Sequence, residues 1–148
     1  ECGLDKLKGE PLVNQIVILK NQIELAEELN KPLILHCVKA FHELIALKKE
    51  LNIKVPIIIH GFNKNEELGE QLLAKGFWLS FGEAVLNKKS SLVKLIQKTD
   101  NFFLETDDSG NSIEEIYHAV AYLKKCTINE LKARIFANFK KLILHKNH

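Results

Sequence analysis

Four short apolar runs, separated by stretches with helical periodicity, constrain the fold of this chain more than any other feature. The runs begin near Leu33, Val55, Phe77 and Phe102, so their starts lie 22, 22 and 25 residues apart. Each run has the length of a buried strand, and the intervals carry apolar residues three or four positions apart, as amphipathic helices do. Alternating strands and helices predict a parallel sheet with right-handed helical crossovers, which is an α/β fold.

The bulk composition is that of an ordinary globular domain, and we expect residues 1–148 to form a single one. The net charge of +2 indicates no strong field toward nucleic acid or a membrane, although a local basic patch is compatible with it. No apolar run approaches the roughly 20 residues of a membrane span. The three scattered cysteines favour a reducing compartment over a disulfide framework, so we expect a cytoplasmic protein.

Three of the apolar runs end in side chains that can bind a metal ion. His36 ends the first run and His60 the second, while the fourth run ends in Glu105 and Asp107. Taken alone, either histidine is more often a hydrogen-bonded structural residue. The carboxyl ends of parallel strands lie on one rim, however, so these side chains can converge there. Imidazole nitrogen and carboxylate oxygen suit zinc, manganese and related divalent ions, and the combination therefore predicts a metal site.

The two acids of the fourth run allow several roles. Glu105 and Asp107 are two positions apart, so both side chains face the same way if the strand continues through them. One could bind the metal ion or take a proton from water, and the other could orient its neighbour. A structural, hydrogen-bonded role is an equal alternative for Glu105. Asp107 or Asp108 could instead cap a turn, and Asp5 also has the setting of a turn acid.

Several short motifs, in this order, resemble those of the TatD family of metal-dependent hydrolases. They are residues 1–5 (ECGLD), 22–26 (QIELA), 32–36 (PLILH), 59–62 (IHGF) and 104–107 (LETD), and residues 137–139 (ANF) are similar to the family's final helix. The resemblance spans essentially the whole chain. It implies a TIM-like (β/α) barrel with two divalent metal ions, which hydrolyses phosphodiester bonds in DNA, often from a single-stranded end.

The resemblance also implies roles for individual residues. The acid at Glu1 would bridge the two metal ions, which could be zinc, magnesium or manganese. His36 and His60 would bind one ion, whereas Asp107 would bind the other and help to activate water. Two such ions can make a bound water more acidic and hold both the attacking and the leaving oxygen of a phosphodiester. We therefore expect Asp107 and Glu105 to be the catalytic acids of a monomeric deoxyribonuclease that acts on DNA or another phosphodiester, without a membrane partner.

The chain departs from the family pattern at several positions. The family carries a His-x-His pair on a strand ahead of the Glu1 motif, and this pair is absent here. We therefore expect residues 1–148 to be roughly the last two-thirds to three-quarters of such a barrel. Gly61 stands where the family usually has cysteine, Val38 where it often has arginine, and no proline follows Asp107. These differences leave open a phosphoesterase or amidohydrolase acting on a small molecule, or an inactive barrel fragment or paralogue retained for binding.

Overall fold

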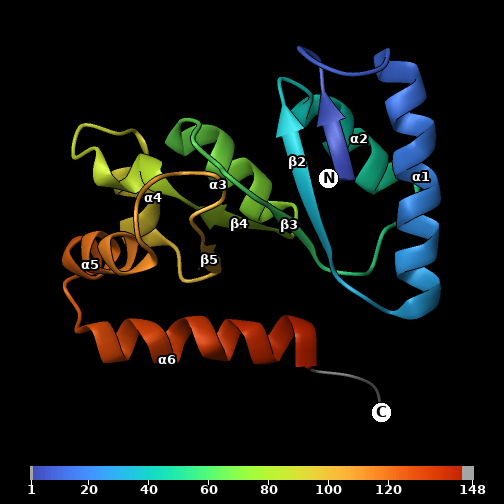
Figure 1. The fold of residues 1–148 in the computed structure, drawn as a ribbon. Helices are drawn as coiled ribbons and strands as arrows, with labels where there is room; N and C mark the ends of the chain where they lie inside the picture. The colour runs from blue at the N-terminus through green and yellow to red at the C-terminus, as the bar shows by residue number, and fades with distance from the viewer. Residues whose placement is uncertain (1, 145–148) are drawn as a thin grey trace.

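A parallel sheet forms the centre of the protein, whose computed structural model describes residues 2–144 of the 148-residue chain. The sheet contains β1 (Cys2–Asp5), β2 (Leu33–Val38), β3 (Ile57–Ile59), β4 (Phe77–Phe81) and β5 (Phe102–Leu104). The strands lie side by side in sequence order and all pairs are parallel. This is the strand order of a (β/α) barrel. Within residues 2–144, β1 and β5 each pair with one neighbour, so the sheet forms an open arc (Figure 1).

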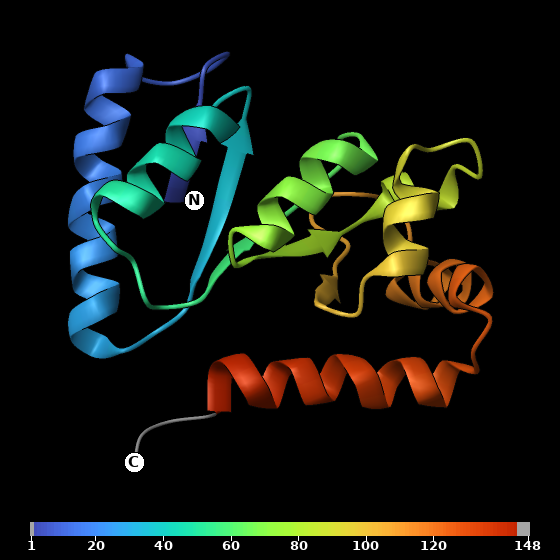
Figure 2. The same cartoon turned by 180° about the vertical axis from the view of Figure 1, so that it is seen from behind.

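Helices follow the strands in alternation. They are α1 (Leu12–Leu29), α2 (Phe41–Glu50), α3 (Glu66–Ala74), the 3-10 turn η1 (Glu83–Leu86), α4 (Leu92–Lys98), α5 (Ile113–Lys124), α6 (Ile128–Phe139) and the π-helical turn η2 (Lys140–Leu144). In Figure 2, α2, α3 and α4 cover one face of the sheet, and α6 runs along the edge at which the strands begin. Within the described part of the chain, no helix is both long and apolar enough to cross a membrane.

Local signals in the sequence fix several helix ends. Thr127 caps α6, because its side chain accepts the N–H of Glu130 while the Glu130 carboxylate accepts the N–H of Thr127. Ser112 forms the same reciprocal pair at the start of α5. The helix α1 ends at Asn30, which adopts a left-handed φ of 49° just before Pro32. The stop at Asn30 ends the crossover helix between β1 and β2, whereas the two N-terminal caps start the helices that follow β5.

The strand β1 is not marked by an apolar run, because Leu4 is its only fully buried side chain. Gly3 pairs in register with His36 and has a φ of +146°. A Cβ at Gly3 would lie 1.9 Å from the carbonyl oxygen of His36, so this close approach requires glycine. The pairing brings Asp5, the last residue of β1, to the edge of the sheet at which β2 ends.

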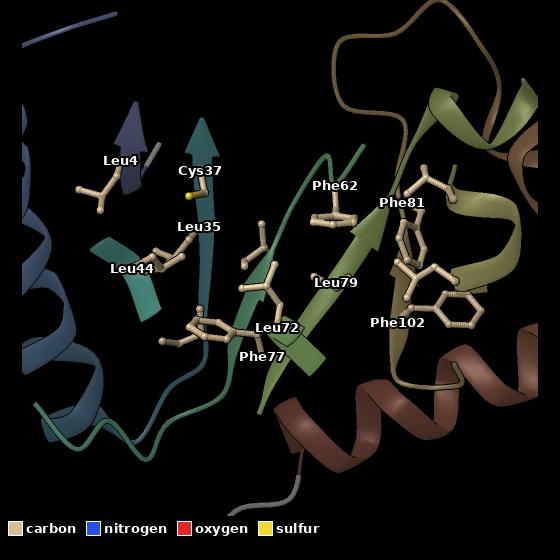
Figure 3. Close-up of a cluster of buried hydrophobic side chains, with 14 of the residues drawn as sticks. Leu4, Leu35, Cys37, Leu44, Phe62, Leu72, Phe77, Leu79, Phe81 and Phe102 are labelled. Atoms are coloured by element: carbon tan, nitrogen blue, oxygen red, sulfur yellow. The ribbon is translucent and has the colours of Figure 1, made fainter. Parts of the chain in front are cut away.

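A continuous hydrophobic core lies between the sheet and its helices, and Figure 3 shows part of it. A row of aromatic rings runs through this core toward the carboxyl ends of the strands. Phe62 lies 6.1 Å from Phe41 and 6.3 Å from Phe81, and Phe81 lies 5.7 Å from Phe102, measured between ring centroids. Each such pair is worth about 0.5–1.5 kcal/mol beyond its burial. The row links the segments that follow β2 and β3 to the strands β4 and β5.

The helix α6 is bonded to the start of β5. The side-chain amide of Asn138, which is 9% exposed, donates to the carbonyl oxygens of Asp100 at 2.7 Å and Phe102 at 2.9 Å. Lys124 and Arg134 lie 2.7 Å and 2.8 Å from the carboxylate of Asp100. The last two helices therefore hold β5 at one end, while its other end leads into the two candidate acids.

Candidate metal centre

The carboxyl edge of the sheet brings together the side chains that the sequence singled out. His60 and Glu105 directly follow β3 and β5, whereas β2 continues past His36 to Val38, so the prediction that His36 ends its strand was wrong. His36 Nδ1 lies 3.3 Å from His60 Nε2, and the ring centroids are 5.3 Å apart. On its other side, His60 Nδ1 lies 3.3 Å from Glu105 Oε1 and 4.0 Å from Asp107 Oδ2. Side chains from three separate βα units thus form one continuous group.

Each histidine has an acid at the nitrogen that points away from the other ring. His36 Nε2 lies 3.3 Å from Asp5 Oδ2, just as His60 Nδ1 lies 3.3 Å from Glu105 Oε1. The result is a line of acid, imidazole, imidazole and acid across the rim. A carboxylate on one ring nitrogen fixes the tautomer and orientation of a metal-binding histidine and makes its other nitrogen a better ligand. The line therefore directs Nδ1 of His36 and Nε2 of His60 toward each other.

The spacing of these nitrogens fits two ligands of a single divalent ion. Zinc binds imidazole nitrogen at about 2.0–2.1 Å, which places two nitrogens of a tetrahedral site about 3.3–3.4 Å apart. The observed separation is 3.3 Å. In addition, His60, Glu105 and Asp107 offer ligand atoms that all lie within 4.8 Å of one another. The donor set and its spacing therefore suit a divalent metal ion.

Glu105 is fixed through both its side chain and its main chain. Its Oε1 accepts the backbone N–H of Gly61 at 2.7 Å while facing His60 Nδ1, and its own N–H donates to the carbonyl oxygen of Phe81 at 3.1 Å. The side chains of His60 and Glu105 are only 14% and 18% exposed. This arrangement favours an orienting role for Glu105 over a purely structural one, because its bonded oxygen contacts the imidazole.

Asp107 does not continue the strand. The strand β5 ends at Leu104, and Asp107 adopts a left-handed φ of 48°. The condition under which Glu105 and Asp107 would share one strand face is therefore not met. A left-handed residue other than glycine costs roughly 1–2 kcal/mol, and such positions cluster at functional sites. The turn leaves the Asp107 carboxylate 51% exposed beside His60, facing the open side of the rim.

Asp5 lies at the site although the sequence marked it only as a turn acid. Its Oδ1 accepts the N–H groups of Leu7 at 2.7 Å and Lys8 at 3.2 Å, which is turn geometry, while its Oδ2 faces His36. The hydrogen bond from Leu7, followed by the contact with His36, holds the pKa of Asp5 below its usual value. The signal that could have revealed Asp5 is its place at a strand end, but β1 itself carries no apolar pattern.

The rim opens into a cleft and a smaller pocket. The cleft has a volume of about 850 Å³ and is lined by β1, the start of α1, His36, His60 and Asp107. A separate pocket of about 210 Å³ is lined by Glu105 and the loop that follows Asp107. Glu1, the predicted bridging ligand, lies outside the described residues, so its role stays a prediction.

Comparison with known proteins places the chain among metal-dependent hydrolases. The family described as TatD related DNase matches residues 1–144. The metal-dependent hydrolase YabD of Bacillus subtilis is 28% identical over an alignment 160 positions long, which spans 96% of this chain and 63% of that protein. The 3'-5' ssDNA/RNA exonuclease TatD of Cronobacter sakazakii is 29% identical over 113 residues, which cover 72% of this chain and 43% of that protein.

Solved structures show the same fold. The TatD homologue YjjV of Escherichia coli superposes with a TM-score of 0.84 at 21% identity, over 99% of this chain and 63% of that one. The predicted fold class, an α/β fold of the TIM-barrel type with parallel strands, is confirmed. The chain spans no more than about two thirds of the length of these relatives. The match over residues 1–144 shows that the chain belongs to the TatD-related DNase family.

Proposed function

We propose that this chain forms the metal-binding rim of a divalent-metal-dependent hydrolase that cleaves phosphodiester bonds in DNA. The observation that carries the proposal is the pair of facing nitrogens on His36 and His60, 3.3 Å apart, each ring backed by an acid. Acid-backed imidazoles are typical of metal-binding sites. A nucleic-acid substrate is supported by the name of the Cronobacter relative, a 3'-5' ssDNA/RNA exonuclease.

In this proposal, some residues of the rim bind a metal ion and another accepts a proton. His36 and His60 would hold one divalent ion, and Glu105 keeps the His60 ring in place through its bond to Gly61. The ion that these residues would hold would make a bound water more acidic and polarise a phosphoryl oxygen. Asp107 lies 4.0 Å from His60 and is half exposed, so its carboxylate can accept a proton from water in the cleft.

We propose two divalent ions in all, of zinc, magnesium or manganese. Asp107 supplies a carboxylate for the second ion, and Glu1 would bridge the two. Carboxylate oxygens suit each of these metals, whereas the imidazole pair favours zinc over magnesium. The two positions therefore differ in their metal preference, and a mixed occupancy is compatible with the donor sets.

The test begins with the metal content and continues with hydrolysis. The purified chain is stripped, loaded with zinc, manganese or magnesium, and its bound metal is measured by mass spectrometry. The loaded protein is then incubated with a labelled single-stranded oligodeoxynucleotide, with the same sequence as RNA, and with bis(p-nitrophenyl) phosphate. We expect metal-dependent release of nucleotides from DNA that a chelator abolishes.

Matched histidine variants separate the site from general effects. His60→Ala should lower the rate by more than about 100-fold, since loss of an acid behind a metal-binding histidine already costs about 10- to 100-fold. The control is His118→Ala, which removes an exposed histidine from α5 and should change nothing. Metal binding without cleavage of either nucleic acid would contradict the assigned substrate. Failure to bind any of the three metals would contradict the proposed function itself.

A further inference from the structure

A glutamine side chain takes the place of a neighbouring strand beside the end of β1. Gln15, in the first turns of α1, accepts the N–H of Asp5 on its Oε1 at 2.7 Å and donates its Nε2 to the carbonyl oxygen of Asp5 at 2.8 Å. The same nitrogen lies 2.6 Å from the carbonyl oxygen of Glu10. This two-sided bond resembles one rung of a sheet ladder. It fixes the main chain of Asp5 on the edge opposite β2.

The carboxylate of Asp5 is fixed as firmly as its main chain. One oxygen accepts the N–H groups of Leu7 and Lys8, and that turn aims the other oxygen at His36 Nε2. The close approach of Gly3 to the backbone of His36 prevents β1 from sliding along β2. The position of the Asp5 carboxylate relative to the His36 ring is therefore set by contacts from three directions.

The His36 ring is more exposed to solvent than the His60 ring. The His36 side chain is 32% exposed, more than twice the exposed fraction of His60. For a metal-binding imidazole, an acid at the second ring nitrogen fixes the orientation of the ring. Within residues 2–144, Asp5 contacts the outward nitrogen of His36 through its Oδ2.

We propose that Gln15 and Asp5 are positioning residues of the metal centre, with Gln15 holding Asp5 and Asp5 holding the His36 ring by accepting its Nε2–H, so that Nδ1 faces the ion. This inference rests on metal binding by His36 and His60, as proposed above. Loss of such a partner lowers metal affinity about 10- to 100-fold. Gln15 acts two contacts away from the ion, so its loss should have the smaller effect of the two.

The test compares Asp5→Asn, Gln15→Ala and the control Gln22→Ala. Gln22 lies on the same helix and lines the same cleft, but within residues 2–144 it has no hydrogen bond to β1. Zinc affinity is measured by competition with a chromophoric chelator. The tautomer of His36 is read from nitrogen-15 NMR of the metal-free protein. Unfolding in urea shows whether each variant is folded under the conditions used.

We expect Asp5→Asn to bind zinc about 10- to 100-fold more weakly. An asparagine that keeps the turn bonds through its oxygen presents an NH₂ group to His36, so the ring proton should move from Nε2 to Nδ1 and block the nitrogen that faces the ion. Gln15→Ala should weaken zinc binding by less and populate both tautomers. Gln22→Ala should match the wild type.

Two results would overturn the inference. One is an Asp5→Asn variant that binds zinc as tightly as the wild type, and the other is a metal-free wild type whose His36 carries its proton on Nδ1. If Asp5→Asn does not fold, Gln15→Ala decides, because it retains the carboxylate and should still weaken zinc binding. If the wild type binds no zinc, the proposed function fails, whereas the tautomers of the metal-free proteins still test whether Asp5 holds His36.

Discussion

The two halves of the metal centre hold their histidines in different ways. On the β3–β5 side, Glu105 fixes His60 from within the sheet, because its own N–H continues the ladder beyond β5. On the β1–β2 side, Asp5 fixes His36 from a turn, and that turn depends on Gln15 in α1. The same pairing of acid and imidazole is thus built once from the sheet and once from a loop with helix support. The first should resist perturbation better than the second.

Removal of His60 should have the largest effect on metal binding. His60 belongs both to the imidazole pair and to the group with Glu105 and Asp107, whereas His36 belongs to the pair and contacts Asp5. We expect His60→Ala to weaken zinc binding by more than about 100-fold, and His36→Ala by less. Competition titrations of the two variants measure the difference. A greater loss for His36→Ala would reverse the comparison.

Glu105 should matter both for the metal and for the fold. Glu105→Ala removes the acceptor of the Gly61 N–H, so we expect the free energy of unfolding to fall by about 1 kcal/mol and zinc affinity to fall about 10- to 100-fold. Glu105→Gln keeps an acceptor and should retain most of the stability, but with weakened zinc binding. Glu83→Ala, which changes an acid of the same small pocket, is the control. Equal zinc affinity in Glu105→Ala and Glu83→Ala would show that Glu105 does not orient His60.

Asn138 tests whether support of β5 can be separated from the site. Asn138→Ala leaves the carbonyl oxygens of Asp100 and Phe102 without their donor, so we expect a loss of about 1–3 kcal/mol in the free energy of unfolding. Urea denaturation measures this loss. Zinc affinity of the folded variant should remain that of the wild type, since these bonds lie at the far end of β5. Weaker zinc binding by the folded variant would mean that the sheet transmits the change to the rim.

The prediction with the smallest expected effect concerns the alkylation of Cys37, which follows His36 on β2. Burial raises the pKa of its thiol to about 12. The reactive thiolate is therefore about one part in 10⁴ at pH 8, and its fraction rises as the pH approaches 12. We expect slow alkylation of Cys37 in native buffer and fast alkylation in urea, followed by mass spectrometry. Rapid native alkylation at pH 8 would show that the β1–β2 side opens more readily than its packing indicates.

Sequence reasoning reached the parts of the protein that repeat a pattern. The apolar runs marked β2 to β5 because buried parallel strands are nearly continuous apolar segments. The same logic placed His60 and Glu105 directly after buried strands, and the parallel sheet brings them to one edge together with His36, which lies inside β2 rather than at its end. The convergence of these side chains follows from the topology and could therefore be predicted from the sequence, whereas the distances between them could not.

The parts that could not be predicted lie outside the pattern of apolar strands. The strand β1 is short and contains Gly3, which is required because the backbone of His36 lies too close for a side chain. Asp5 gains its role from a residue 31 positions away, and Gln15 gains its role from Asp5. The left-handed turn at Asp107 likewise has no apolar signature. No periodicity within one segment records such pairings.

The central claim is that His36 and His60 share one metal ion, and X-ray absorption at the zinc edge tests it most directly. The protein is loaded with one equivalent of zinc, and the scattering from imidazole ligands is fitted for the wild type, His36→Ala and His60→Ala. We predict two imidazole nitrogens at about 2.0–2.1 Å in the wild type and one in each variant. Zinc bound without imidazole, or with the same number of imidazoles in all three proteins, would contradict the account.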